Sequence, residues 1–91
     1  MSDIPVPPNK KRVRITPFIG QMVVFWRTLL GLTQEELAKR AGVSLSTLKK
    51  IEAGRKHGPW FGTLEDLCEA MDICLQELIA GAGRLAAQRQ G

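Results

Sequence analysis

The sequence predicts a compact all-α fold of five helices with no strands. Apolar residues recur at spacings of three and four along most of the chain, which is the pattern of helices that each bury one face. Hydroxyl residues stand where helices would begin, and glycines follow where several would end. The 91 residues suffice for one small domain, whose core alone supplies only about 3–5 kcal/mol, so association with a second copy would help it.

The first residues predict a disordered or extended basic arm. Residues 1–14 contain three prolines and the run KKRVR, so they offer no apolar face to bury. We therefore assign residues 1–15 to a flexible arm, residues 16–80 to the folded domain and residues 81–91 to a C-terminal tail.

A first helix is predicted to begin at Thr16, whose hydroxyl can cap it, with Pro17 in its first turn, and to run to about Leu30. One apolar stripe faces the predicted core and consists of Ile19, Val23, Trp26 and Leu30. A second stripe follows the same spacing on another face and consists of Phe18, Met22, Phe25 and Leu29. This second stripe is either covered by the chain's own C-terminal residues or available to a partner, and both alternatives stay open.

Residues 33–54 predict two short helices joined by a tight turn. Thr33 and Glu36 can form a capping box at the start of the first, and Gly42 can adopt the left-handed conformation that ends it. Ser44 can cap the second helix, and Gly54 ends it. Apolar residues on the buried sides of the pair are Leu37, Ala38, Ala41, Val43, Leu48 and Ile51, and the side chains expected to point outward are Leu45, Ser46, Lys49 and Lys50.

Two further helices are predicted in the second half of the chain. The first follows Trp60 and has its apolar positions at Phe61, Leu64, Leu67, Cys68 and Met71. Thr63 with Asp66 offers a competing, later start for it. The last helix is expected around Leu75–Ala80, after which the glycine-containing end of the chain frays or forms a weak extra turn.

The charges are sorted along the chain. Residues 39–58 hold six basic residues against one acidic residue, whereas residues 59–77 hold five acidic residues and no basic one. Clustered lysine and arginine around a short helix favour a surface that binds a polyanion such as a nucleic acid. The basic, turn-rich loop that contains Arg55 and Lys56 suits contact with phosphates.

Several classes of function lack support. Cys68 and Cys74 form no CxxC pair and His57 stands alone, so we expect neither a metal site nor a cofactor. There are no paired carboxylates, no nucleophile with a base and no glycine-rich phosphate loop, so we expect no catalytic residue and no enzyme activity. No apolar run reaches the roughly 20 residues of a membrane span, and the N-terminus lacks a signal peptide's apolar core, so we expect a cytoplasmic protein without a membrane partner.

The segments GLTQEELAKRAGVS and STLKKIEAG match the pattern of a known family through Gln34, Leu37, Ala38, Gly42, Val43, Leu48, Ile51, Glu52 and Gly54. With these residues the sequence resembles the lambda-repressor-like (Cro/CI, XRE) helix-turn-helix family over residues 19–80. The steric reason for the pattern is that the two helices cross closely, so the contact needs the small Ala38 and the turn needs Gly42.

The resemblance implies roles for individual residues. Gln34 matches the family position that holds a DNA phosphate, and Arg27 with Glu52 matches an ion pair between the first helix and the recognition helix. The positions that read base edges in the major groove are occupied by Leu45, Ser46 and Lys50, with Lys49 beside them. Departures from the family pattern are Leu45 in place of a polar base reader, Asp72 in place of a helix-ending glycine, Cys74 in place of a capping Ser or Thr, and apolar Val24, Phe25 and Leu29.

The function implied is that of a sequence-specific DNA-binding transcriptional regulator, expected to be a small dimeric repressor or autoregulator that reads double-stranded DNA with residues 44–53. Its basic arm would serve either as a solubilising tail or as a contact to the DNA backbone or a groove. The alternative function is that of an antitoxin or adaptor that binds a protein partner through the Phe18, Met22, Phe25 and Leu29 stripe. That stripe could equally be the interface of the homodimer.

Overall fold

The computed structural model describes residues 16–55 and 61–90, with side chains at residues 17–55 and 61–88. Within these residues it contains five helices and no strands, as predicted: α1 (Thr16–Leu29), α2 (Gln34–Ala41), α3 (Leu45–Glu52), α4 (Phe61–Met71) and α5 (Leu75–Gln90). The expected arm at residues 1–15, the Thr16 hydroxyl cap and the loop residues Lys56 and His57 lie outside what the structure describes.

The helix pair α2–α3 forms where its capping residues predict. The Thr33 hydroxyl accepts a hydrogen bond from the Glu36 N–H at 3.0 Å, and the Thr33 N–H donates to Glu36 Oε1 at 2.8 Å, which completes the capping box. Gly42 then takes the left-handed conformation, with φ of 73°, and ends α2. The Ser44 hydroxyl caps α3 by accepting from the Thr47 N–H at 3.0 Å.

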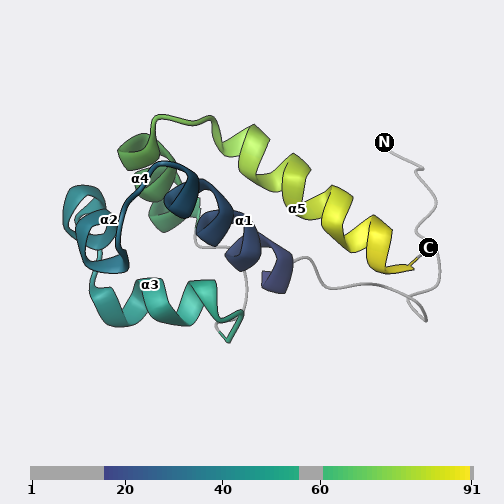
Figure 1. Cartoon of the computed structure of the whole chain (residues 1–91), viewed down its shortest axis with the longest axis horizontal. Helices are drawn as coiled ribbons and strands as arrows, with labels where there is room; N and C mark the ends of the chain where they lie inside the picture. Colours follow the sequence, from purple (N-terminus) through teal and green to yellow (C-terminus); the bar gives the residue numbers. More distant parts are fainter. Residues whose placement is uncertain (1–15, 56–60, 91) are drawn as a thin grey trace, which may run out of the picture.

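The helix α1 lies between α3 and α5, while α2 packs against α3 and α4 (Figure 1). Their buried sides meet in one apolar core, whose largest fully covered side chains are Val23, Leu37, Leu48, Leu64, Leu67 and Leu78. Because α1 contacts helices on both sides, it is the element that joins the helix-turn-helix pair to the C-terminal half of the chain.

Two of the predicted core positions are wrong. Leu30 is 47% exposed, because α1 ends at Leu29 and the left-handed Gly31, with φ of 72°, turns the chain so that Leu32 reaches the core instead. Phe61 is 55% exposed, because it opens α4 one turn before Leu64, where that helix first enters the core. The helix starts at Phe61, so the later start offered by Thr63 is not used.

The predicted end of the last helix is also wrong. The helix α5 does not fray after Ala80 but continues through Gln90. Gly81 and Ala82 are buried, and a Cβ added at Gly81 would lie 2.5 Å from the terminal carbon of Met22. The small residues therefore allow α5 to pack closely on α1, and this packing outweighs the low helix propensity of glycine. None of the described helices is long and apolar enough to cross a membrane.

A close backbone approach fixes α3 against α1. Gly20 is buried in the middle of α1, and a Cβ there would collide with the backbone carbonyl oxygen of Ile51 in α3. At the end of α3, Gly54 packs against Pro17 in the first turn of α1 and has a φ of 71°. These two glycines let α3 lie along α1 at short range, which holds the outer face of α3 in a fixed orientation.

Candidate nucleic-acid interface

The outer face of α3 carries polar and basic side chains. Ser46, Lys49 and Lys50 are exposed, while the opposite side of the helix is buried through Leu48 and Ile51. The two lysines lie in the last turn of α3, where the helix dipole favours positive charge. The structure thus brings three of the four predicted base-reading residues onto one accessible helical surface.

The fourth residue, Leu45, was expected to point outward, and this is wrong. Its side chain is half-buried and packs against the core. Leu45 stands three residues before Leu48, so the two side chains share a side of α3. Only the uncovered part of Leu45 is left to contact a ligand.

A hydrogen-bonded network lies behind this face and is centred on Glu52. Arg27 Nε donates to Glu52 Oε2 at 2.7 Å and Arg27 Nη2 donates to Oε1 at 3.1 Å, which forms the ion pair that the family resemblance implied. The side chains are well covered, with exposed fractions of 14% for Arg27 and 5% for Glu52. Arg27 Nη1 also donates to the Leu32 carbonyl oxygen at 2.9 Å. One arginine therefore ties α1 to both the start of the helix pair and the end of α3.

Gln34 belongs to the same network, which the sequence did not predict. Its side-chain Nε2 donates to Glu52 Oε1 at 2.8 Å, across 18 positions of sequence. Gln34 is the first residue of α2, where backbone N–H groups have no partner inside the helix. The side-chain amide of Gln34 is thus held by the protein.

The N-terminal turn of α2 also carries acidic residues. The side chain of Glu36 faces the backbone of Thr33, and hydrogen bonds from the Thr33 N–H and hydroxyl lower the pKa of its carboxyl below the usual value. Glu35 lies beside it in the same turn and is exposed. Both carboxylates therefore lie in the first turn of α2, where the helix dipole favours negative charge.

Arg55 follows directly after α3 and is exposed. Its backbone N–H donates to the Lys50 carbonyl oxygen at 3.0 Å, so its position relative to the basic face is fixed by the end of the helix. Lys56, the other predicted phosphate contact, lies outside the described residues.

The second apolar stripe of α1 divides into two halves. Phe18 and Met22 are half-buried and pack against the core, as the alternative of internal packing predicted. Phe25 is 51% exposed and Leu29 is 64% exposed, as the alternative of a partner surface predicted. The reason is that α5 covers only part of α1, so neither alternative describes the whole stripe.

Within residues 16–55 and 61–90, no group of three or more metal-binding side chains comes together. The two cysteines are free thiols, with Cys68 buried and Cys74 exposed. Burial raises the pKa of the Cys68 thiol to about 11, so it stays protonated at neutral pH and acts as a small apolar core residue.

Comparison with known proteins identifies the architecture. The family model described as helix-turn-helix matches residues 26–78. The uncharacterized HTH-type transcriptional regulator RghRB of Bacillus subtilis (strain 168) is 33% identical over 73 residues, which are 80% of this chain and 52% of that protein. The chain therefore spans about half the length of this relative.

Two solved structures are similar to the chain. The clp gene regulator ClgR from Corynebacterium glutamicum has a TM-score of 0.78 at 25% identity and covers 85% of this chain and 81% of its own. The master regulator for biofilm formation SinR, solved in complex with DNA, has a TM-score of 0.64 at 33% identity and covers 67% of this chain and 97% of its own. Together with the matched residues 26–78, they place the chain in the lambda-repressor-like (Cro/CI, XRE) helix-turn-helix family.

Proposed function

We propose that the chain is a sequence-specific DNA-binding transcriptional regulator that inserts α3 into the major groove. The observation that carries this proposal is the structure of α3 itself. One side of the helix is locked into the core and braced by Arg27 and Glu52, and the other side exposes Ser46, Lys49 and Lys50. A rigid helix with polar and basic side chains on its free face has the form that direct readout of base edges requires.

The proposed roles follow the geometry of each side chain. Lys50 and Lys49 donate to acceptors on the base edges or to nearby phosphates, and Ser46 can donate or accept. Leu45 offers only the uncovered edge of its side chain, which suits van der Waals contact with a thymine methyl group. Phosphates on either side of the reading helix would be held by the α2 N-terminus at Gln34 and by Arg55 and Lys56.

We further propose that the regulator acts in the cytoplasm as a homodimer on two half-sites about one helical turn, roughly 34 Å, apart. Residues 16–80, together with the remainder of α5 that packs on α1, would form the DNA-binding unit, with repression or autoregulation as the mode of action. The relatives that support a regulatory role are ClgR, a gene regulator, and SinR, which was solved with DNA.

The test of this function is footprinting of the full chain on the DNA around its own gene. The expected result is protection of two adjacent major-groove segments on one face of the duplex. The control is the same footprinting titration with Arg84→Ala, which should leave the protection unchanged. Arg84 is an exposed arginine of α5, and α5 lies on the other side of α1 from α3 (Figure 1). Protection that is absent, or equal over all sequences, would overturn the proposal of sequence-specific binding.

A second candidate function, that of an antitoxin or adaptor, is favoured by the exposed apolar side chains at the end of α1. Phe25, Leu29 and Leu30 are 51%, 64% and 47% exposed. Phe25→Asp is expected to abolish pull-down of such a partner while leaving DNA binding intact. Sedimentation of the same variant distinguishes the other alternative, because a shift to monomer would identify this surface as the homodimer interface.

A further inference from the structure

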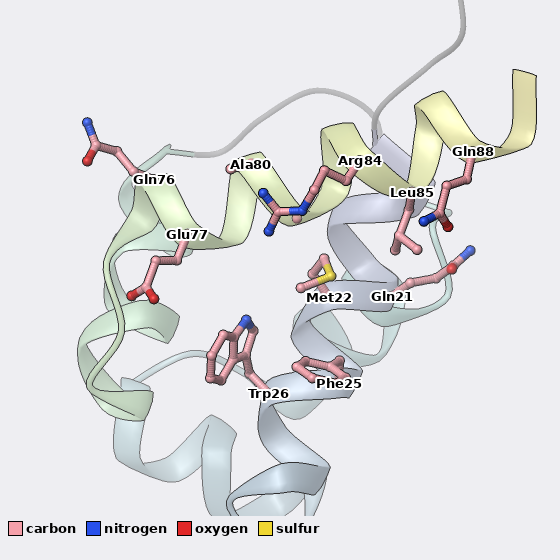
Figure 2. Close-up of a pocket in the computed structure, with 11 residues that line it drawn as sticks. Gln21, Met22, Phe25, Trp26, Gln76, Glu77, Ala80, Arg84, Leu85 and Gln88 are labelled. Carbon is pink, nitrogen blue, oxygen red and sulfur yellow. The ribbon is translucent and has the colours of Figure 1, made fainter. Parts of the chain in front are cut away.

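A largely apolar groove of about 750 Å³, also lined by Glu77 and Arg84, lies between α1 and α5. The helix α5 runs along α1 in the opposite direction (Figure 1), and the groove opens between them on one side. Its α1 wall contains Met22, Phe25 and Trp26, and its α5 wall contains Ala80 and Leu85 (Figure 2). The volume is within the range of sites that bind small molecules or short peptide segments.

Two aromatic side chains give this groove a specific chemistry. The rings of Phe25 and Trp26 meet edge to face, with their centroids 5.4 Å apart. The indole N–H of Trp26 is buried and has no acceptor among the described residues. In Figure 2 this nitrogen lies on the side of the ring that faces α5. A buried donor without an acceptor is unfavourable, so an occupant that supplies a carbonyl oxygen beside the aromatic rings would be favoured.

We propose that the proline-rich segment Ile4–Pro8 of the same chain binds in this groove as a polyproline-type ligand. Pro5 and Pro8 are three positions apart, which places both rings on one edge of a polyproline II helix. Such a helix has no internal hydrogen bonds, so its carbonyl groups are free to accept from an indole N–H. Grooves lined by aromatic side chains recognise proline-rich segments through these two features.

The chain is long enough for this contact. Pro8 precedes the first residue of α1, Thr16, by eight positions, which can span about 26 Å when extended. Trp26 lies ten positions into α1, about 15 Å along the helix axis. A segment tethered at this distance has an effective concentration on the order of millimolar, so a weak intrinsic affinity suffices for occupancy.

Docking of Ile4–Pro8 also positions the basic run Lys10–Arg14. This run is the tether between the groove and Thr16, so it is held at the N-terminal end of α1, where Pro17 packs against Gly54 at the end of α3. This inference goes beyond the proposed function and does not depend on DNA binding.

The experiment compares indole N–H resonances of ¹⁵N-labelled full chain with those of Pro5→Gly/Pro8→Gly. The Trp60→Phe variant assigns the Trp26 signal, because the chain has two tryptophans. Docking predicts that the Trp26 indole N–H shifts and exchanges faster with water in the double variant. The matched control is Asn9→Gly, which changes the same arm outside the proline motif and should leave the Trp26 signal in place.

The groove side is tested with Phe25→Ala, whose side chain is largely exposed and therefore dispensable for the core. This variant is expected to move the Val6 methyl signals to the positions they have in Pro5→Gly/Pro8→Gly. An unchanged Trp26 indole signal in the double variant would overturn the proposal. Contacts between Trp26 and Val6 that arise only between differently labelled copies would overturn it as well, because the segment would then bind a second molecule.

Discussion

At the scale of single residues, Glu52 connects the fold to the proposed reading surface. Its carboxylate accepts three hydrogen bonds, two from Arg27 and one from Gln34, in a position where only 5% of the side chain is exposed. A carboxylate this covered is stable only with its partners in place. The same residue closes α3, so any loss of its partners acts on the orientation of that helix.

The substitution Arg27→Ala tests this network. We expect it to lower the free energy of unfolding by about 3 kcal/mol, because it leaves Glu52 buried without its counter-charge. Urea denaturation measures the change. The control Lys39→Ala removes an exposed cation from α2 and should stay within about 0.5 kcal/mol of the parent. Equal stability of the two variants would show that the ion pair is not structural.

Asp72 is a second residue whose backbone conformation has a testable effect on stability. Asp72 lies between α4 and α5 and has a φ of 59°, in the left-handed region. The family pattern has a helix-ending glycine at this position. A residue with a Cβ is disfavoured there, although Asp less than most. Asp72→Gly is therefore expected to raise the free energy of unfolding by about 0.5–1 kcal/mol, measured by thermal denaturation.

The control is the same substitution at Asp66, for which we expect the opposite change in stability. Asp66 is exposed in the interior of α4, where glycine lowers helix stability, so Asp66→Gly should destabilise by roughly 0.5–1 kcal/mol. Loss of stability in both variants would mean that the backbone at Asp72 is not strained.

At the scale of elements, the predictions succeeded where local chemistry decides the structure. The bounds of α2 and α3 follow from Thr33, Ser44 and Gly42, whose side chains or conformations act within one turn. They failed where the outcome depends on which neighbour covers a face. Tertiary packing decides the burial of Leu30, Leu45 and Phe61 and the length of α5. Periodicity alone does not tell which of two apolar stripes is covered.

The contact between α1 and α3 is an element-scale feature that periodicity also missed. Gly20→Ala should destabilise the protein by about 1–3 kcal/mol, because the added methyl group collides with the Ile51 carbonyl oxygen and must push α3 away. Gly62→Ala in α4 is the matched control, because no neighbouring atom lies within 4 Å of the added Cβ. The control should be stabilised by roughly 0.5–1 kcal/mol. Denaturation of both variants measures their free energies of unfolding. A change of the same sign in both variants would contradict the close approach of α1 and α3.

At the scale of the whole molecule, the basic and the acidic residues, which cluster in different parts of the sequence, lie on different helices. The basic face of α3 lies on one side of α1, and α5 lies on the other (Figure 1). The acidic residues Glu65, Asp66 and Glu69 are exposed on α4, which packs against α2 and α5. Such a separation favours approach to a polyanion with α3 in front. The exposure of Ser46, Lys49 and Lys50 was predictable from the sequence, but the Gln34 hydrogen bond and the α1–α5 groove required the packed structure.

The most direct test of DNA reading by α3 is a fluorescence anisotropy titration of the footprinted duplex and of a scrambled duplex, at several salt concentrations, with the parent chain and Lys50→Ala. We expect the logarithm of the parent's affinity to fall linearly with the logarithm of salt concentration. Lys50→Ala should reduce the ratio of specific to scrambled affinity by about tenfold. Salt-independent binding, or an unchanged ratio in Lys50→Ala, would contradict this role for α3.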